Sequence, residues 1–317
     1  MSILGIATHK FCQEHDAGPD HPERWGRVAV ILDALQRESL WESVREYEAR
    51  AATVEDVSYI HNPKYIEAMR RLCEKGGEFL PSMDAAVGPE SYPAALHAAG
   101  AGLTLADEIM NGQIQMGFAA IRPPGHHSIY ARPWGFCIFN NISILAKYLI
   151  EKYSLKRIAV VDFDVHHGNG TEQAFWADPK VLYCSIHQED YFPADTGNWH
   201  DTGEGEGEGF TINIPVAARC DDETWLSAFD RYAIPRLEEF EPQIVLVSVG
   251  FDGHWRDIIS GIKLTGKAFS GIGSRILKIA EGSADGKIIS VLEGGYDDVG
   301  TAEGAVAYFS ALMSRTE

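Results

Sequence analysis

The sequence predicts an α/β fold with a central, mostly parallel sheet. Short, nearly continuous apolar runs alternate along the chain with segments of helical periodicity, which is the pattern of β-α-β connections. The 317 residues are 45% hydrophobic and 23% charged, as in ordinary globular proteins. A chain of this length can bury most of its apolar surface without disulfide bonds. It contains no repeat, long linker or low-complexity block that would favour another architecture.

Seven apolar runs are the expected strands of this sheet. Their almost continuous apolar character is typical of strands that are covered by helices on both faces. The runs lie at residues 4–7, 116–121, 158–161, 181–186, 210–215, 244–249 and 288–292.

Helical spacing fills the gaps between several of these runs. The segment at 64–74 follows Asn62-Pro63, a helix cap and a first-turn residue, and Gly76 is placed to end it. The other expected helices lie at 24–36, 91–110 and 266–281.

Charge and hydropathy exclude two broad classes of function. The net charge of −19 argues against a general basic surface for nucleic acid. No apolar run approaches the roughly 18 residues of a membrane span, and we see no signal peptide, so we expect a cytoplasmic protein. The five cysteines form no C-x-x-C pair and are expected to be reduced core thiols.

Polar segments follow four of the expected strands, at 122–127, 162–170, 250–254 and 293–297. Parallel sheets bind their ligands beyond the carboxyl ends of the strands. We therefore expect these four segments to converge on one crevice.

The D-x-H pattern of Asp164 and His166 suggests a metal site. Residues two apart on an extended segment point the same way, so both side chains can reach one ion. Asp252, which follows another apolar run, is a candidate third ligand. Three protein ligands with an open position describe a catalytic metal site, which these donors can form with zinc, ferrous iron or cobalt. The alternative for the D-x-H pair alone is a capping aspartate beside a structural histidine.

His126 and His127 follow Pro-Pro-Gly and are candidates for proton transfer. A hydrolase needs a base that activates water and an acid that protonates the leaving group. Asp162 and Asn169 flank the proposed metal ligands and can fix the tautomers of the two imidazoles. The alternative is a pair of loop histidines with no role.

These motifs together resemble the histone deacetylase family, within the arginase–deacetylase fold. The resemblance extends from H-P-E-R at 21–24 to L-E-G-G-Y at 292–296. It includes R-P-P-G-H-H, G-F-C-x-F-N-N, D-x-D-x-H-H-G-N-G and G-F-D. The chain looks most like the class II and bacterial amidohydrolase branch, because Asn169 stands where class I members carry an aspartate. The resemblance implies one catalytic domain over residues 1–317, with a three-layer α/β/α architecture.

The resemblance also implies roles for individual residues. It makes Asp164, His166 and Asp252 the ligands of one Zn²⁺, His126 and His127 the catalytic pair, with Asp162 and Asn169 behind them, and Tyr296 the transition-state tyrosine. Gly135, Phe136, Phe192 and Ile259 would line the substrate tunnel. A potassium ion would lie near Asp162 and the Ser185 hydroxyl, and Phe175 and Val181 match a second such site.

The implied activity is zinc-dependent hydrolysis of an N-acetyl amide, such as that of acetyllysine, to a free amine and acetate. An acetylated polyamine or another small N-acyl amine is an alternative substrate. Ile259 argues mildly against a polyamine, since polyamine-selective relatives place a glutamate in this loop. The rival functions are a two-metal ureohydrolase and a non-catalytic ligand-binding protein. The motifs define neither the oligomeric state nor the preferred acyl chain.

One departure from the family pattern follows G-F-D. Many relatives have small residues there, whereas this chain has His254, Trp255 and Arg256. We expect His254 to lie at the tunnel rim or on the surface rather than to act as a spare metal ligand.

Overall fold

An eight-stranded sheet forms the centre of the protein, in a computed structural model that describes residues 4–80 and 83–314. The strand order is β2-β1-β5-β10-β9-β6-β7-β8, and every neighbouring pair is parallel. The strands are β1 (Leu4–Thr8), β2 (Val44–Glu48), β5 (Met116–Ala119), β6 (Ile158–Asp162), β7 (Val181–Gln188), β8 (Thr211–Val216), β9 (Ile244–Val249) and β10 (Ile288–Leu292). A separate antiparallel pair is formed by β3 (Glu78–Leu80) and β4 (Ala85–Val87).

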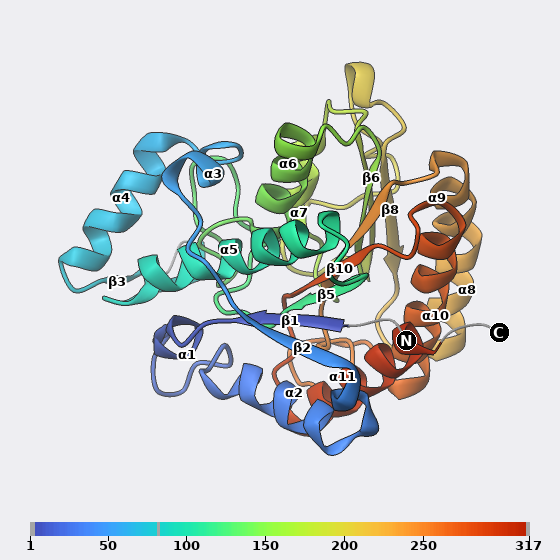
Figure 1. Ribbon diagram of the computed structural model, residues 1–317, viewed down its shortest axis with the longest axis horizontal. Coiled ribbons are helices and arrows are strands. Elements are labelled where there is room, and N and C mark those ends of the chain that lie inside the picture. Colours follow the sequence, from blue (N-terminus) through green and yellow to red (C-terminus); the bar gives the residue numbers. More distant parts are fainter. Residues whose placement is uncertain (1–3, 81–82, 315–317) are drawn as a thin grey trace.

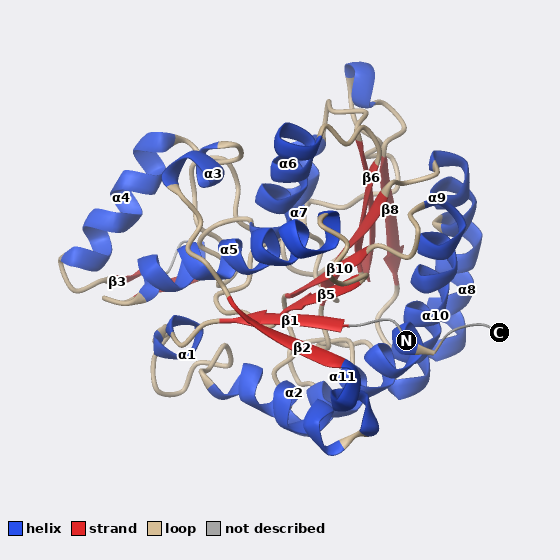
Figure 2. Ribbon diagram, in the orientation of Figure 1, coloured by secondary structure: helices blue, strands red, loops and turns tan. Residues whose placement is uncertain are grey.

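Helices cover both faces of the sheet (Figure 1, Figure 2). On one face α5 packs against α6 and against β1 and β5, and on the other α11 packs against α2 and α10. The helices are α1 (Phe11–Glu14), α2 (Gly26–Arg37), α3 (Val54–Ser58), α4 (Pro63–Glu74), α5 (Ser91–Met110), α6 (Asn141–Tyr153), α7 (Asn169–Phe175), α8 (Asp222–Tyr232), α9 (Ile234–Phe240), α10 (Gly266–Ser283) and α11 (Asp298–Met313), with 3₁₀ turns at Ser39–Ser43 and Gly205–Gly207. The predicted three-layer α/β/α fold is confirmed.

All seven apolar runs form strands of the central sheet. Every residue of β5, β6, β7, β9 and β10 is buried, because helices cover both sides of these strands. The boundaries differ by at most two residues: the run at 116–121 leaves the sheet after Ala119, and the run at 181–186 continues to Gln188.

The four expected helices are present as well. Helix α4 begins at Pro63 with the Asn62 side chain accepting a hydrogen bond from the Lys64 amide. Gly76 follows its end with a φ of 101°, a conformation that glycine adopts without strain. Helix α2 begins two residues later than expected, at Gly26.

The strand order explains where a site can form. Strands β5, β10, β9 and β6 are consecutive neighbours in the sheet, so the segments that follow them emerge side by side at one edge. These are the segments in which the sequence places its polar motifs. Within the described residues no helix is both long and apolar enough to cross a membrane, and the expected cytoplasmic location stays a prediction.

Candidate active site

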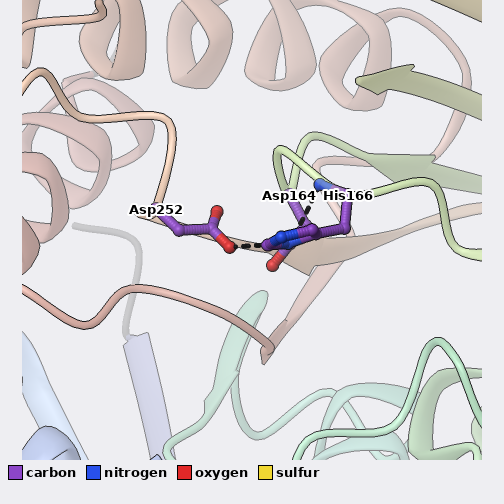
Figure 3. Close-up of side chains that lie close together, drawn as sticks. All are labelled: Asp164, His166 and Asp252. Atoms are coloured by element: carbon purple, nitrogen blue, oxygen red, sulfur yellow. Dashed lines mark hydrogen bonds and ion pairs between the residues drawn. The ribbon is translucent and has the colours of Figure 1, made fainter. Parts of the chain in front are cut away.

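Asp164, His166 and Asp252 form a candidate metal centre. Asp164 and His166 come from the loop after β6, and Asp252 comes from the loop after β9 (Figure 3). One ligand atom from each of these buried residues lies within 4.8 Å of the other two. His166 Nδ1 is 3.0 Å from Asp164 Oδ1 and 3.0 Å from Asp252 Oδ2. Across residues 4–80 and 83–314 this is the one cluster of His, Cys, Asp and Glu side chains that meets this criterion.

The surroundings of this cluster fit a divalent cation. Asp252 Oδ2 is buried and has no hydrogen-bond partner, despite lying close to His166. Burial and the facing Asp164 carboxylate raise the pKa of Asp252. Such groups are ordinarily paired or bound to a metal.

Gly294 completes the cradle from the loop after β10. Its amide donates a 2.7 Å hydrogen bond to Asp164 Oδ2 and so orients that carboxylate. A Cβ at position 294 would lie 2.2 Å from Asp252 Oδ2 and 2.5 Å from Asp164 Oδ2. Only glycine therefore lets this backbone approach the two carboxylates.

His126 and His127 lie next to the metal centre, with their ring centroids 4.0 Å apart. His126 Nδ1 is 3.0 Å from Asp162 Oδ2, and His127 Nδ1 is 2.9 Å from Asn169 Oδ1. Both acceptors are oxygens, so each Nδ1 carries the hydrogen and each Nε2 is left to face the cavity.

The two imidazoles differ in basicity. Burial would lower the pKa of His126, but the carboxylates of Asp162, Asp164 and Glu293 outweigh it and raise that pKa to about 10. Burial, followed by the positive charges of His126 and His166, holds the pKa of His127 well below its usual value. The surroundings therefore favour the charged form of His126 and the neutral form of His127.

Tyr296 lies in the loop after β10 and lines the same cavity as the histidines. Its ring makes an edge contact with Phe136, with centroids 5.9 Å apart, and the Arg27 guanidinium lies 4.6 Å from the ring centroid. Burial raises the pKa of Tyr296 well above its usual value, by more than Arg27 lowers it. The phenol therefore keeps its proton and is available as a hydrogen-bond donor.

A cavity of about 210 Å³ is lined by His166 of the metal cluster, by the histidine pair and by Tyr296. Its lining includes the four residues that were expected in the tunnel, which are Gly135, Phe136, Phe192 and Ile259. It also includes Asp84 and Tyr191, which the sequence did not suggest. A Cβ at Gly135 would lie 2.5 Å from the His127 ring and 2.8 Å from Phe192, so a larger residue would push into the cavity. A larger hollow of about 830 Å³ beside α7 contains none of the chemical groups described above.

Ser185 lies on β7, paired in register with Asp162 on β6. Its Oγ is 2.8 Å from His187 Nδ1, and His187 Nε2 is 3.0 Å from the Gly197 carbonyl oxygen. His187 must donate through Nε2, so its Nδ1 accepts the Ser185 proton. The Ser185 oxygen then acts as an acceptor towards its other neighbours. Phe175, in α7, and Val181, the first residue of β7, are both buried.

A buried network of charged side chains supports the site, and no role was predicted for it. Glu23 forms ion pairs with Arg27 at 3.0 Å and with Arg122 at 2.6 Å, and all three side chains are inaccessible to solvent. Burial opposes ionisation of Glu23, but Arg122 and Arg27 together lower its pKa to about 2. Arg27 also donates to the carbonyl oxygens of Gly295 and Glu293, which fixes the loop that carries Tyr296.

Glu293 is a further buried support that sequence reasoning missed. Its Oε2 accepts hydrogen bonds from the amides of Gly125 and His126, and its Oε1 accepts one from Ser248. It thereby joins the loop that carries the histidine pair to the end of β10. The E-G-G-Y motif was the available signal, but the motif alone does not show what its glutamate contacts.

The expectation that His254 lies at the rim or on the surface is wrong. The side chain is fully buried and stacks on Phe269 of α10, with its Nε2 3.5 Å from Glu303 Oε2 of α11. Gly300 makes room for it, since a Cβ there would lie 2.5 Å from His254 Nδ1. The imidazole thus packs the loop after β9 against α10 and α11, and Trp255 beside it is half exposed.

A three-layer fold with a clustered Asp-His-Asp set, a histidine pair and a tyrosine defines a candidate metal-dependent hydrolase of the arginase–deacetylase fold. The chain belongs to the histone deacetylase family, since residues 21–312 match the histone deacetylase domain. It is a hydrolase of the deacetylase and amidohydrolase type found in that family.

Several relatives match almost the whole chain. A probable deacetylase of Archaeoglobus fulgidus is 37% identical over 96% of this chain and 84% of its own length. The histone deacetylase-like amidohydrolase of Pseudomonas aeruginosa is 33% identical over 88% of this chain and 72% of its own. The human polyamine deacetylase HDAC10 is 35% identical over 97% of this chain and 46% of its own. The crystal structure of the HDA15 HD domain superposes with a TM-score of 0.91 at 29% identity, covering 98% of this chain and 88% of that one.

Proposed function

We propose that the protein is a zinc-dependent deacetylase that hydrolyses the N-acetyl amide of acetyllysine or a similar amine, within one catalytic domain spanning residues 1–317. The observation that carries this proposal is the convergence of three kinds of groups on one cavity. These groups are the Asp-His-Asp cluster, which reaches the cavity through His166, a histidine pair of unequal basicity and a protonated phenol.

Asp164, His166 and Asp252 would hold the zinc ion. When bound, zinc polarises the acetyl carbonyl and acidifies a water molecule. The cluster offers one nitrogen and two carboxylates, which leaves room for substrate and water, as in catalytic rather than structural zinc sites. No second cluster lies among the described residues, which speaks against a two-metal ureohydrolase.

The chain's own residues move the protons. His127 is neutral and presents Nε2, so it accepts a proton from water as the oxygen attacks the acetyl carbon. The charged His126 assists it, and a protonated histidine then delivers a proton to the amine nitrogen as the C–N bond breaks. Tyr296 donates a hydrogen bond to the oxygen on which negative charge develops. The products are acetate and the free amine.

A potassium ion near Asp162 is a second part of the proposal. The orientation of the Ser185 hydroxyl, which gives its proton to His187, supports it because oxygen lone pairs are the ligands of hard cations. Such an ion would lie behind His126, where burial raises the pKa of Asp162. The match of Phe175 and Val181 to a second potassium site is carried forward on the resemblance alone.

The rim supports acetyllysine over acetylated polyamine. Ile259 lines the cavity, and an isoleucine side chain offers no charge to a secondary ammonium group. The likeness to a polyamine deacetylase keeps acetylated polyamines as the alternative.

A substrate panel on zinc-loaded protein tests the function. We expect turnover of acetyllysine peptides, weaker turnover of acetylated polyamines, and loss of both after treatment with a chelator. Measured acetate release and bound metal decide between the candidates. No turnover of any acylated amine despite bound zinc would support a ligand-binding protein. Two metal equivalents per chain would support a ureohydrolase.

Replacing Asn169 with aspartate tests the role of His127. The neutral amide orients His127 but does not stabilise its cation, whereas a carboxylate 2.9 Å from Nδ1 would. The pKa of His127 should therefore rise in Asn169→Asp. Since the base must be neutral to accept a proton, the acidic limb of the kcat/KM profile should move to higher pH. An unchanged pH–rate profile would exclude His127 as the group that this limb reports.

A further inference from the structure

Asp257 joins the two loops that close the cavity. Its side chain is buried, with 3% exposed. Oδ2 accepts hydrogen bonds from the amides of Tyr296 at 2.7 Å and Asp297 at 3.1 Å. Oδ1 accepts one from the amide of Ile259 at 3.0 Å. One carboxylate thus holds both the phenol loop and the rim loop 257–260.

Asp257 is itself firmly anchored. Its amide donates a 2.9 Å hydrogen bond to the carbonyl oxygen of His254, the residue that packs against Phe269 of α10 and Gly300 of α11. The position of Tyr296 is therefore tied to the helical layer through His254 and Asp257.

The phenol loop needs such a support. Gly295 has a φ of 116°, a region that glycine enters and leaves easily, so the peptide before Tyr296 has little intrinsic preference for its present orientation. Arg27 fixes the carbonyl oxygens of Glu293 and Gly295, on the amino-terminal side of the tyrosine. Asp257 fixes the amides of Tyr296 and Asp297, at the tyrosine and after it.

The rim loop depends less on Asp257. The Tyr191 hydroxyl donates to the Ile259 carbonyl oxygen. The Ser260 hydroxyl donates to the Asp252 carbonyl oxygen at 2.9 Å, and the Gly261 amide donates to Gln188 Oε1 at 2.7 Å. These three bonds remain when the carboxylate is altered.

We propose that Asp257 is a positioning residue that aims the Tyr296 phenol at the developing oxyanion by gripping the backbone of the tyrosine loop. This inference rests on the proposed function of Tyr296 and adds a residue that acts through it. On this inference Asp257 contributes to the rate of turnover, and not to metal binding or substrate entry.

The substitution Asp257→Asn separates these effects. An amide has one acceptor oxygen, so it cannot accept all three backbone N–H groups. Those it still accepts from the tyrosine loop are weaker, because the carboxylate charge is lost. Since displacements of about 1 Å cost on the order of 10²-fold in rate, we expect kcat to fall about 10- to 100-fold. KM should change less than about 3-fold because the rim loop keeps its other anchors. Bound zinc should stay at one per chain.

A double-mutant cycle with Tyr296→Phe provides the decisive readout. If Asp257 acts through the phenol, Asp257→Asn should cost less than about 3-fold in the Tyr296→Phe background. An equal loss in both backgrounds would show a general structural role and overturn the inference. Asp257→Asn with normal kcat would overturn it too. Near-normal turnover of Tyr296→Phe itself would overturn the proposed function instead, so the two failures are distinguishable.

Two further variants protect this test against misfolding. Asp56→Asn is the matched control, since Asp56 is a buried carboxylate that accepts the Thr53 amide at 2.8 Å in the cap of α3, away from the cavity. It should lower the unfolding midpoint without altering kcat. If Asp257→Asn does not accumulate as a folded protein, Asp257→Glu, which keeps the charge but displaces it, is taken through the same cycle.

Discussion

Replacing Asp252 with alanine is expected to lower kcat by about 10³-fold or more and to remove most of the bound metal. Asp252 Oδ2 is buried without a hydrogen-bond partner, so a bound cation would be its main partner. Polarisation of the substrate and acidification of water by the metal are worth several kcal/mol, and each 1.4 kcal/mol corresponds to a factor of ten.

The measurement is metal content by mass spectrometry together with kcat on an acetyllysine peptide. Asp56→Ala serves as the control, since it removes another buried carboxylate from a place that does not touch the cavity. A protein that loses the metal but retains turnover within about tenfold of the wild type would contradict the assignment of Asp252. Retention of one equivalent of metal would mean that the ligand set is drawn from other residues.

Replacing Tyr296 with phenylalanine is expected to lower kcat by about 10²- to 10³-fold while the protein still binds metal. That range is the usual cost of losing one hydrogen-bond donor to an oxyanion. The phenol stays protonated because burial raises its pKa, so it is a donor throughout the working pH range. The aromatic contacts with Phe136 and Arg27 do not involve the hydroxyl and should survive the change.

Measuring kcat and KM separately shows whether Tyr296 acts in the transition state or in substrate binding. An interaction made only in the transition state lowers kcat and kcat/KM equally. A rise in KM alone would make Tyr296 a binding residue, and near-normal turnover would remove it from the mechanism. The metal content of the variant, measured in parallel, shows that the cradle beneath it is intact.

The sheet was predictable because strands that are buried on both faces consist of apolar residues. Strands β6, β9 and β10 are covered on both sides, so they read as unbroken apolar runs. Strand β2 was missed since it lies at the sheet edge, and none of its residues Val44–Glu48 is fully buried. Helix α11 was missed for a different reason: Asp298–Met313 is rich in glycine and alanine and has little contrast between its faces.

The residues of the candidate site were predictable where they follow strands in recognisable patterns. Parallel topology brings such residues to one edge without any knowledge of the side chains. The supports behind them were not predictable in this way. Asp257 and Ile259 are close in sequence to each other, but the contact of Asp257 with Tyr296 spans 39 positions. Arg27 reaches Gly295 across 268 positions, which no local pattern reports.

The position of His254 was likewise not predictable from its local sequence. A histidine between a glycine and a tryptophan, just past a candidate metal ligand, reads as a residue of the rim. Its burial depends on Gly300, nearly 50 positions away, which leaves space for the imidazole beneath α11. Packing between distant segments, rather than local polarity, decided its position.

A metal titration tests the central claim most directly. Metal-free protein is supplied with increasing zinc while bound metal and the initial rate of acetate release from an acetyllysine peptide are measured on the same samples. If Asp164, His166 and Asp252 hold one catalytic ion, the rate should rise in proportion to bound zinc and level off at one equivalent per chain. Full activity without metal, or a rate that appears only with the second equivalent, would contradict it.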